Sequence, residues 1–313
     1  MPTTYYLDHM QGSKEFRFDK LILKDIDNEP VKKYHKSDMT DVEYCLFHFE
    51  VSSGDEYLEG LHDYIKKSLK TGNPAPVVRF ADGEYAFYAE SLQCNGLYQQ
   101  AESVRAIRDA IPTHIQALKL LDQVGKFAPV IFPGNVQPKK QTLFSFLRKK
   151  KGDDSAREFI EFLYKNNIKL TRDNYIPFFV VYAYLTSARF SKLMDGRKLC
   201  IVSSECNMES LRQWFNRFYS RPHIVFTQIP ESYVATQWQQ AKADILANIP
   251  SDTDICLVGA GIGSLLVCID IANEFSIPAI DAGHVLNMMN GREDKSDGPR
   301  LYTLHKKTHE RSI

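Results

Sequence analysis

Six short apolar runs recur along the chain from residue 77 onward, and each run is continuous rather than alternating with polar residues. Continuous runs are typical of strands buried on both faces, and helical periodicity follows these runs. The expected strands are residues 77–80, 129–132, 198–203, 223–226, 254–258 and 277–281. Strands that alternate with helices predict an α/β fold with a Rossmann-like, doubly wound and mostly parallel sheet, covered by helices on both faces. The order of the strands in the sheet stays open.

The segments outside this repeat divide the chain into three predicted parts. Residues 1–53 contain two strand-like runs, 16–23 and 44–51, and are predicted to form an N-terminal β-rich extension. Residues 54–290 hold the alternating pattern and form the predicted Rossmann-like domain. Residues 291–313 are a polar C-terminal tail. Oligomer contact, acceptor binding and protection of a sheet edge are the three roles that the extension could serve.

Local signals also predict several features of the helices. Residues 103–121 have helical spacing, and Pro112 is expected to kink or divide that helix. Residues 174–190 are predicted to form one buried helix. A further helix is expected to begin at Glu84. Another is expected over residues 232–249, with Ser232 as its N-cap.

Charge and cysteine usage narrow the class of protein. Lysine plus arginine equals aspartate plus glutamate, 39 each, so there is no basic field that would favour nucleic acid. We expect no signal peptide and no membrane-spanning run. The six cysteines form no C-x-x-C pair, which favours reduced thiols in a cytoplasmic protein over a zinc site. The basic residues between 139 and 151 predict a solvated helix end, with contact to an anionic acceptor or a membrane surface as the alternative.

The expected strand 77–80 ends in a turn that carries Arg79, Asp82, Gly83 and Glu84. In an open α/β sheet, ligands bind at the carboxyl ends of the strands. Two carboxylates one residue apart suit a divalent cation whose shell a bound phosphate completes, and Arg79 fits a phosphate or a carboxylate. The alternative is a plain helix start, with Asp82 as N-cap and Glu84 favoured by the helix dipole.

A second turn follows the expected strand 254–258 and contains Gly259, Gly261 and Gly263. Glycines permit positive φ and close approach of the backbone, and a helix start presents free N–H groups to an anion. Phosphate binding is therefore one hypothesis, and tight strand–helix packing is the other. The next expected strand ends in Asp281 and His284, which are either site residues or an N-cap with a satisfied histidine.

These stretches together resemble the GT-D glycosyltransferases, a bacterial family with a Rossmann-like fold and an Asp-x-Glu motif. The front motif here is Arg79-Phe80-Ala81-Asp82-Gly83-Glu84, in which alanine replaces the family's first glycine. Gly259-Ala260-Gly261 and Ala279-Ile280-Asp281-Ala282-Gly283-His284 match the motifs near the back. Residues 229–233 are similar to the family's Ile-Pro-Ser-x-Asn segment but lack its asparagine.

The resemblance implies transfer of a sugar from a nucleotide sugar, most often a UDP-sugar, to a glycan, glycolipid or glycoprotein acceptor. It implies a divalent cation, Mn or Mg, held by Asp82 and Glu84, which match the Asp-x-Glu pair. A homo-oligomer, and a cytoplasmic enzyme peripheral to the membrane, are compatible with this function.

Further residues are candidates for donor binding or catalysis. Arg79 would serve the leaving diphosphate or brace the two acids, and the amides after Gly261 would cradle the pyrophosphate. Asp281 and His284 would hold the donor or act as base, and a carboxylate with a shifted pKa is an alternative base. Two weaker candidates are Arg172, for phosphate or a surface ion pair, and Tyr233, for stacking on a base or packing in the core.

Two other functions are compatible with the same turns. Residues 258–263 are similar to the first loop of S-adenosylmethionine-dependent methyltransferases, although only about fifty residues follow, so a permuted chain would be required. A non-catalytic nucleotide-binding protein is the second alternative, because Ala81 departs from the family motif.

Overall fold

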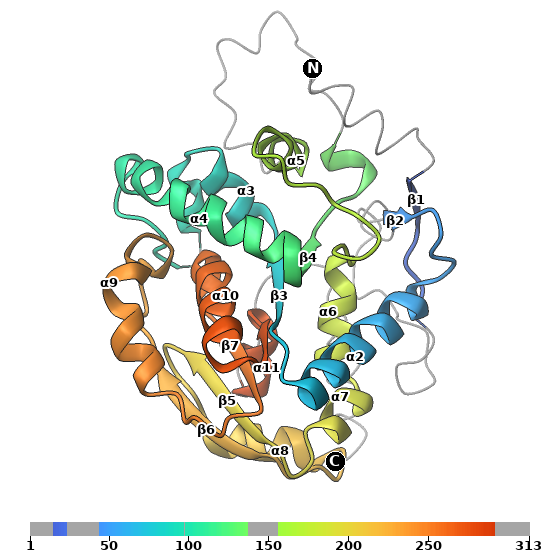
Figure 1. Ribbon diagram of the computed structural model, residues 1–313, viewed down its shortest axis with the longest axis vertical. Helices are drawn as coiled ribbons and strands as arrows, with labels where there is room; N and C mark the ends of the chain where they lie inside the picture. The colour runs from blue at the N-terminus through green and yellow to red at the C-terminus, as the bar shows by residue number, and fades with distance from the viewer. Residues whose placement is uncertain (1–14, 24–43, 97, 137–155, 292–313) are drawn as a thin grey trace, which may run out of the picture.

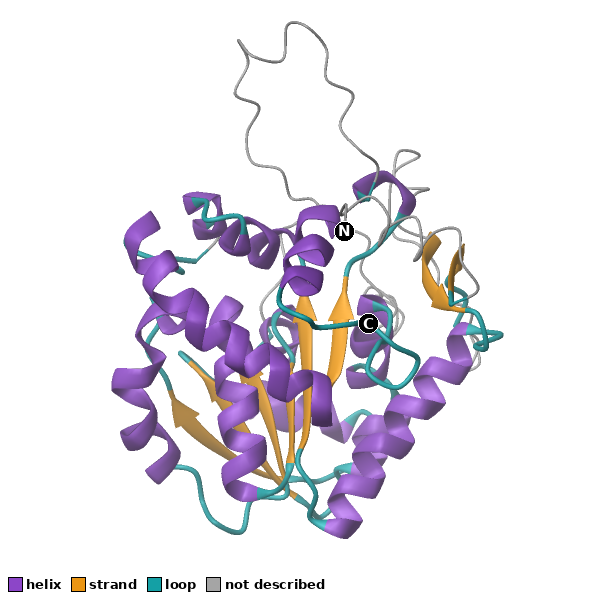
Figure 2. Cartoon of the chain, turned by 45° about the horizontal axis from the view of Figure 1, so that its top comes forward, coloured by secondary structure: helices purple, strands orange, loops and turns teal. Residues whose placement is uncertain are grey.

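A computed structural model of the protein describes residues 15–23, 44–96, 98–136 and 156–291. Its centre is a six-stranded sheet with the order β4-β3-β8-β7-β5-β6, in which every neighbouring pair is parallel (Figure 2). The strands are β3 (Ala75–Phe80), β4 (Lys126–Pro129), β5 (Lys198–Ser203), β6 (His223–Gln228), β7 (Ile255–Gly259) and β8 (Pro278–Asp281). The predicted fold class is confirmed.

Helices cover both faces of this sheet, because each parallel connection must cross back over it. One face carries α4 (Val104–Val124), α9 (Val234–Ala247) and α10 (Ser264–Phe275) (Figure 1). The other face carries α2 (Gly54–Thr71), α6 (Phe178–Leu185), α7 (Ala188–Leu193), α8 (Met208–Asn216) and α11 (His284–Met289). The remaining helices are α3 (Asp82–Tyr88), α5 (Ala156–Lys165), η2 (Leu92–Asn95), η3 (Pro133–Asn135) and η4 (Gly261–Gly263).

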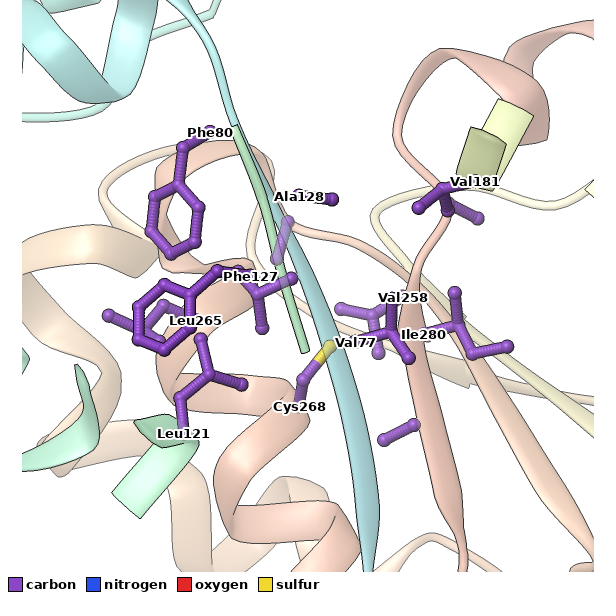
Figure 3. Close-up of a cluster of buried hydrophobic side chains, with 14 of the residues drawn as sticks. Val77, Phe80, Leu121, Phe127, Ala128, Val181, Val258, Leu265, Cys268 and Ile280 are labelled. Carbon is purple, nitrogen blue, oxygen red and sulfur yellow. The ribbon is translucent and has the colours of Figure 1, made fainter. Parts of the chain in front are cut away.

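The hydrophobic core lies on both sides of β3. Figure 3 shows Leu121 of α4 and Leu265 of α10 on one side of the strand and Val181 of α6 on the other. All three side chains and Val77 between them are almost fully buried. Burying a side chain of this size contributes about 1.5–3 kcal/mol, so the sheet is stabilised from both faces.

Two strands of the predicted N-terminal extension form an antiparallel pair, β1 (Phe16–Lys20) and β2 (Tyr44–His48). The pair packs on the main core, where the rings of Phe16 and Tyr175 meet edge to face at 5.7 Å. The Leu46 N–H donates to the Ile131 carbonyl, and the Tyr175 hydroxyl donates to the Leu46 carbonyl. The tail from residue 292 and the basic residues 139–151 lie outside the described residues.

The second sheet strand lies earlier in the chain than predicted. β4 spans Lys126–Pro129 and not 129–132. The Val130 N–H still donates to the Phe80 carbonyl, but the Ile131 carbonyl then accepts from Leu46 of β2. The apolar run therefore continues as an extended link between two sheets, which apolarity alone does not distinguish from a strand.

The single helix predicted for residues 174–190 is wrong. The chain instead leaves a turn at Asn174 and pairs with β4 through Tyr175: the Phe127 N–H donates to the Asn174 carbonyl, and the Ile176 N–H donates to the Phe127 carbonyl. Pro177 disfavours helix at the residue before it, so α6 begins only at Phe178. The Ser187 hydroxyl then accepts from the Phe190 N–H and starts α7 as a separate helix.

Two predictions about helix interiors and caps also need correction. α4 runs without interruption from Val104 to Val124, so Pro112 does not divide it. Pro112 is exposed, where water can satisfy the carbonyl that loses its helical partner. Ser232 is not the cap of α9; that position belongs to Tyr233, which has the left-handed φ of 64°.

No helix in the described part of the chain is both long enough and apolar enough to cross a bilayer.

Candidate functional site

A cavity of about 780 Å³ opens at the carboxyl edge of the sheet, where β3, β8, β7 and β5 end. The chain leaves β5 towards β6 and leaves β7 towards β8, so the connections diverge between these neighbouring strands. Such a switch point leaves a crevice for a ligand. Among the predicted site residues, those that line the cavity are Arg79, Asp82, Glu84, Tyr233, Gly259, Gly261, Asp281 and His284. The turn that carries Asp82 and Glu84 (the acidic turn) and the turn that carries Gly259 and Gly261 (the glycine turn) thus face one cleft.

The acidic turn presents its two carboxylates differently. Ala81 is the N-cap of α3, and Asp82 is the first helical residue, so Asp82 is not the cap. Glu84 does part of the capping, because its Oε2 accepts a 2.8 Å hydrogen bond from the Ala81 N–H. The exposed Asp82 carboxylate makes no hydrogen bond or ion pair with any other described residue. Asp82 is therefore available to a ligand.

Glu84 is poised between its charged and neutral forms. Withdrawal of its carboxylate from water raises its pKa to about 7, against the opposing effect of the Ala81 hydrogen bond. Asp281 nearby raises the same pKa further, and Arg79 lowers it. A positive charge bound in the cleft would favour the ionised form.

Arg79 is bound to Asp281 rather than to the acidic turn. Its Nη2 donates to Oδ1 of Asp281 at 2.9 Å, and its Nε donates to the Asp281 carbonyl at 2.8 Å. The guanidinium also lies 5.2 Å from the ring centroid of Phe178 and 4.9 Å from that of Tyr182. Burial acts against the charge of Arg79, but the attraction and hydrogen bond of Asp281, together with smaller contributions from Tyr182 and Glu84, raise the pKa of Arg79 above its usual value. A Cβ on Gly283 would lie 1.7 Å from Nη2, so only glycine fits beside this pair.

These contacts bear on the expectations for Arg79 and Asp281. Arg79 braces Asp281 and does not bridge Asp82 and Glu84. Asp281 is 3% exposed and its second oxygen, Oδ2, accepts from the backbone N–H of Arg79, so both oxygens of the carboxylate already accept hydrogen bonds from Arg79. The Nη1 group of Arg79 makes no hydrogen bond with the other described residues and remains for a ligand in the cleft.

The glycine turn, for which phosphate binding and tight strand–helix packing were the two hypotheses, already uses two of its backbone amides within the protein. The Ile262 N–H donates to Oε1 of Gln100 at 2.9 Å, and the Ala260 N–H donates to the Ser264 hydroxyl. Gly261 has φ 55°, and a Cβ there would meet the Gln100 carboxamide at 2.6 Å. The turn is therefore shaped around a side chain from elsewhere in the chain. Gly263 does not line the cavity; it packs against Val234, whose Cγ1 would lie 2.5 Å from an added Cβ.

The remaining predicted residues separate into two groups. His284 is the first residue of α11, partly exposed at the cleft, and Tyr233 lines the cleft from the start of α9. Arg172 lies away from the cavity. Its Nη1 forms an ion pair with Glu50 at 2.7 Å, and both side chains are more than half exposed. Of the two interpretations of Arg172, the surface ion pair is correct.

Sequence reasoning missed the loop between α3 and α4. Asn95, Tyr98 and Gln100 from this loop line the cavity, as do Phe178 and Tyr182 of α6. The Asn95-Gly96 dipeptide marks a turn, but nothing in the local pattern shows that the turn folds over a glycine corner more than 150 residues later.

A cation would fit this site only together with a ligand. Among the residues that the structure describes, no group of three or more His, Cys, Asp or Glu side chains could hold a metal ion. Asp82 and Glu84 supply two carboxylates at the cleft. Mg²⁺ commonly binds in this way, with one or two carboxylates and the phosphates of the substrate.

Comparison with known proteins finds a family match in the carboxyl-terminal part of this chain. Residues 151–289 match a family described as a GT-D fold-like domain, which bears out the resemblance for this part of the chain. A solved structure described by the words "The highly conserved domain of unknown function 1792 has a distinct glycosyltransferase fold" is similar at 18% identity and a TM-score of 0.45, over 78% of this chain and 84% of that one. No curated protein matches the sequence.

Proposed function

We propose that this protein is a glycosyltransferase that moves a sugar from a nucleotide sugar, specifically a UDP-sugar, to a glycan or glycoconjugate acceptor. The GT-D-like domain over residues 151–289 supports a glycosyltransferase. One observation carries the finer assignment: the acidic turn after β3 and the turns after β7 and β8 line one cavity of about 780 Å³. That volume lies in the range of ligand sites that enclose a small molecule.

The chemistry of sugar transfer matches the charges around this cavity. As the bond between the sugar and the diphosphate breaks, negative charge develops on the leaving diphosphate, and fixed positive groups lower the barrier. Asp82 and Glu84 would hold a divalent cation, Mn or Mg, which neutralises that charge when bound. Nη1 of Arg79 would donate to a phosphate oxygen, since Asp281 fixes the rest of the guanidinium.

The acceptor hydroxyl must lose a proton as it attacks the sugar. In this proposal His284 takes that proton, because imidazole is the side chain that most readily exchanges protons near neutral pH and His284 lines the cleft. Asp281 pairs with Arg79 and orients its guanidinium.

Activity of the two acidic variants tests the proposal. We expect UDP release from a panel of UDP-sugars, and we expect Asp82→Asn and Glu84→Gln each to lower the rate at least a hundredfold because the charge on the leaving group is no longer offset. Excess EDTA should lower wild-type turnover to a similar extent, and added Mn²⁺ should restore it. The measurement is UDP formation by a coupled assay.

Glu274→Gln is the matched control, because Glu274 is exposed near the end of α10 that is farthest from the cleft. It should keep the wild-type rate. If both acidic variants kept the wild-type turnover and melting temperature, the proposed role of Asp82 and Glu84 in catalysis would be wrong. The two acids would then only favour the start of the helix.

A further inference from the structure

The Gln100 side chain reaches from the loop after η2 onto the turn after β7. Its Oε1 accepts the Ile262 N–H at 2.9 Å, and the residue is 7% exposed. Asn95 fixes the loop, since its Oδ1 accepts from the N–H groups of Gln100 at 2.7 Å and Ala101 at 2.9 Å. Gln100 is thus held by one hydrogen bond at its backbone N–H and by another at its side-chain oxygen.

This hydrogen bond determines which way the amide faces. A backbone N–H can meet only the oxygen of a carboxamide, so the nitrogen Nε2 must take the other position. Nε2 has no hydrogen-bond partner among the described residues. It is also not among the described polar atoms that are sealed from solvent without a partner. Because Gln100 lines the cleft, Nε2, which has no partner in the described part of the chain, can donate to a ligand there.

We infer that Gln100 is a donor-binding residue, whose Nε2 donates a hydrogen bond to an acceptor oxygen of the nucleotide sugar. This inference rests on the proposed function and names a group of the same cleft. The oxygen belongs either to a phosphate or to a carbonyl of the pyrimidine, both of which accept from an amide N–H. Gly261 then has a definite purpose: it leaves room for the carboxamide rather than for the phosphate itself.

A rival role for Gln100 predicts the opposite sign. If the carboxamide only covers the Ile262 N–H until a phosphate replaces it, its removal would expose that amide and strengthen UDP binding. If Nε2 holds the ligand, its removal weakens binding. The direction of the change in affinity therefore separates the two roles.

Gln100→Glu is the sharpest variant, because a carboxylate oxygen can still accept from Ile262 while the other oxygen replaces the N–H donor. We expect Gln100→Glu to weaken UDP binding about tenfold to a hundredfold, measured by isothermal titration calorimetry. Gln100→Ala should weaken it in the same direction. Gly261→Ala, which displaces the carboxamide, should do the same in protein whose melting curve shows that it is folded. Gln116→Glu on the exposed face of α4 is the control and should bind UDP as the wild type does.

Three ligands distinguish the possible acceptor oxygens. A loss with UDP and pyrophosphate but not with uridine assigns the contact to phosphate, and a loss with UDP and uridine assigns it to the base. Unchanged or tighter UDP binding by Gln100→Glu and Gln100→Ala would overturn the inference and leave the proposed function standing. If the wild type bound none of the three ligands, the nucleotide-sugar function would fail, and this inference with it.

Discussion

Arg79 and Asp281 are separated by 202 positions in the chain, yet they form a buried ion pair at the base of the cleft. Their side chains are 8% and 4% exposed, so water does little to screen either charge. A buried pair of this kind adds modest net stability, but removal of one partner leaves the other charge uncompensated. Because separating the two charges would cost free energy, the pair holds Arg79 and Asp281 in fixed positions at the cleft.

Asp281→Asn should lower the free energy of unfolding by about 3 kcal/mol, because the Arg79 guanidinium stays buried without its counter-charge. Urea denaturation of the ligand-free protein measures this change. Glu50→Gln provides the control, since it breaks the exposed Arg172–Glu50 pair and should cost less than about 1 kcal/mol. Equal costs for the two variants would contradict the structural role assigned to the Arg79–Asp281 pair.

At the scale of elements, one buried histidine joins three helices beside the cleft. His114 of α4 is fully buried. Its Nε2 lies 2.8 Å from the Ala235 carbonyl of α9, which can only accept, so Nε2 carries the proton. Its Nδ1 then accepts from the Tyr88 hydroxyl of α3 at 3.1 Å. The neutral ring thus connects α3, which carries the acidic turn, to α9, whose N-cap is Tyr233.

This histidine should make stability depend on pH. Burial lowers the pKa of His114 from 6.5 to about 4, so between these values the unfolded chain binds a proton that the folded protein does not. Stability is therefore present above pH 6.5 and is lost as the pH falls towards 4, by at most about 3 kcal/mol. Urea denaturation of the wild type and of His114→Gln, which does not titrate, at pH 7 and pH 4 measures the effect. If the difference in free energy of unfolding between the two proteins were the same at pH 7 and pH 4, His114 would not be the cause of the pH dependence.

At the scale of the whole molecule, the cleft lies at one edge of the sheet, with turns from both halves of the chain around it. The match to the GT-D-like family covers residues 151–289, which include the glycine turn and Asp281 but not Asp82 or Glu84. A ligand that contacts both groups would bridge these parts and stabilise the fold as one unit.

Thermal melting with a panel of ligands tests which class of ligand does this. UDP and UDP-sugars at about 100 times the dissociation constant should stabilise the protein by about 2.7 kcal/mol, visible as a higher melting temperature. S-adenosylmethionine should cause no shift. The reverse result would favour the methyltransferase alternative, and a shift with UDP but no turnover of any UDP-sugar would favour a non-catalytic nucleotide-binding protein.

The sequence predicted those features that depend on short stretches of chain. The number of strands in the sheet, their parallel character and the turns after β3, β7 and β8 all follow from apolar runs and from glycine and acidic residues near strand ends. The predictions were wrong where the same local sequence pattern is compatible with two structures. An apolar run after Pro129 became a link to β2, and residues 174–176 paired with Phe127 instead of entering a helix.

The sequence by itself determined most of the strands and helices and the two turns that carry chemical groups, because each depends on neighbouring residues. Only the tertiary structure decided that β8 lies between β3 and β7, which brings Asp281 to Arg79 and leaves Asp82 as the freer acid. It likewise decided that Gln100 occupies the glycine turn. Strand neighbours and loop contacts depend on how the whole core packs, and no periodicity in a local stretch of sequence specifies them.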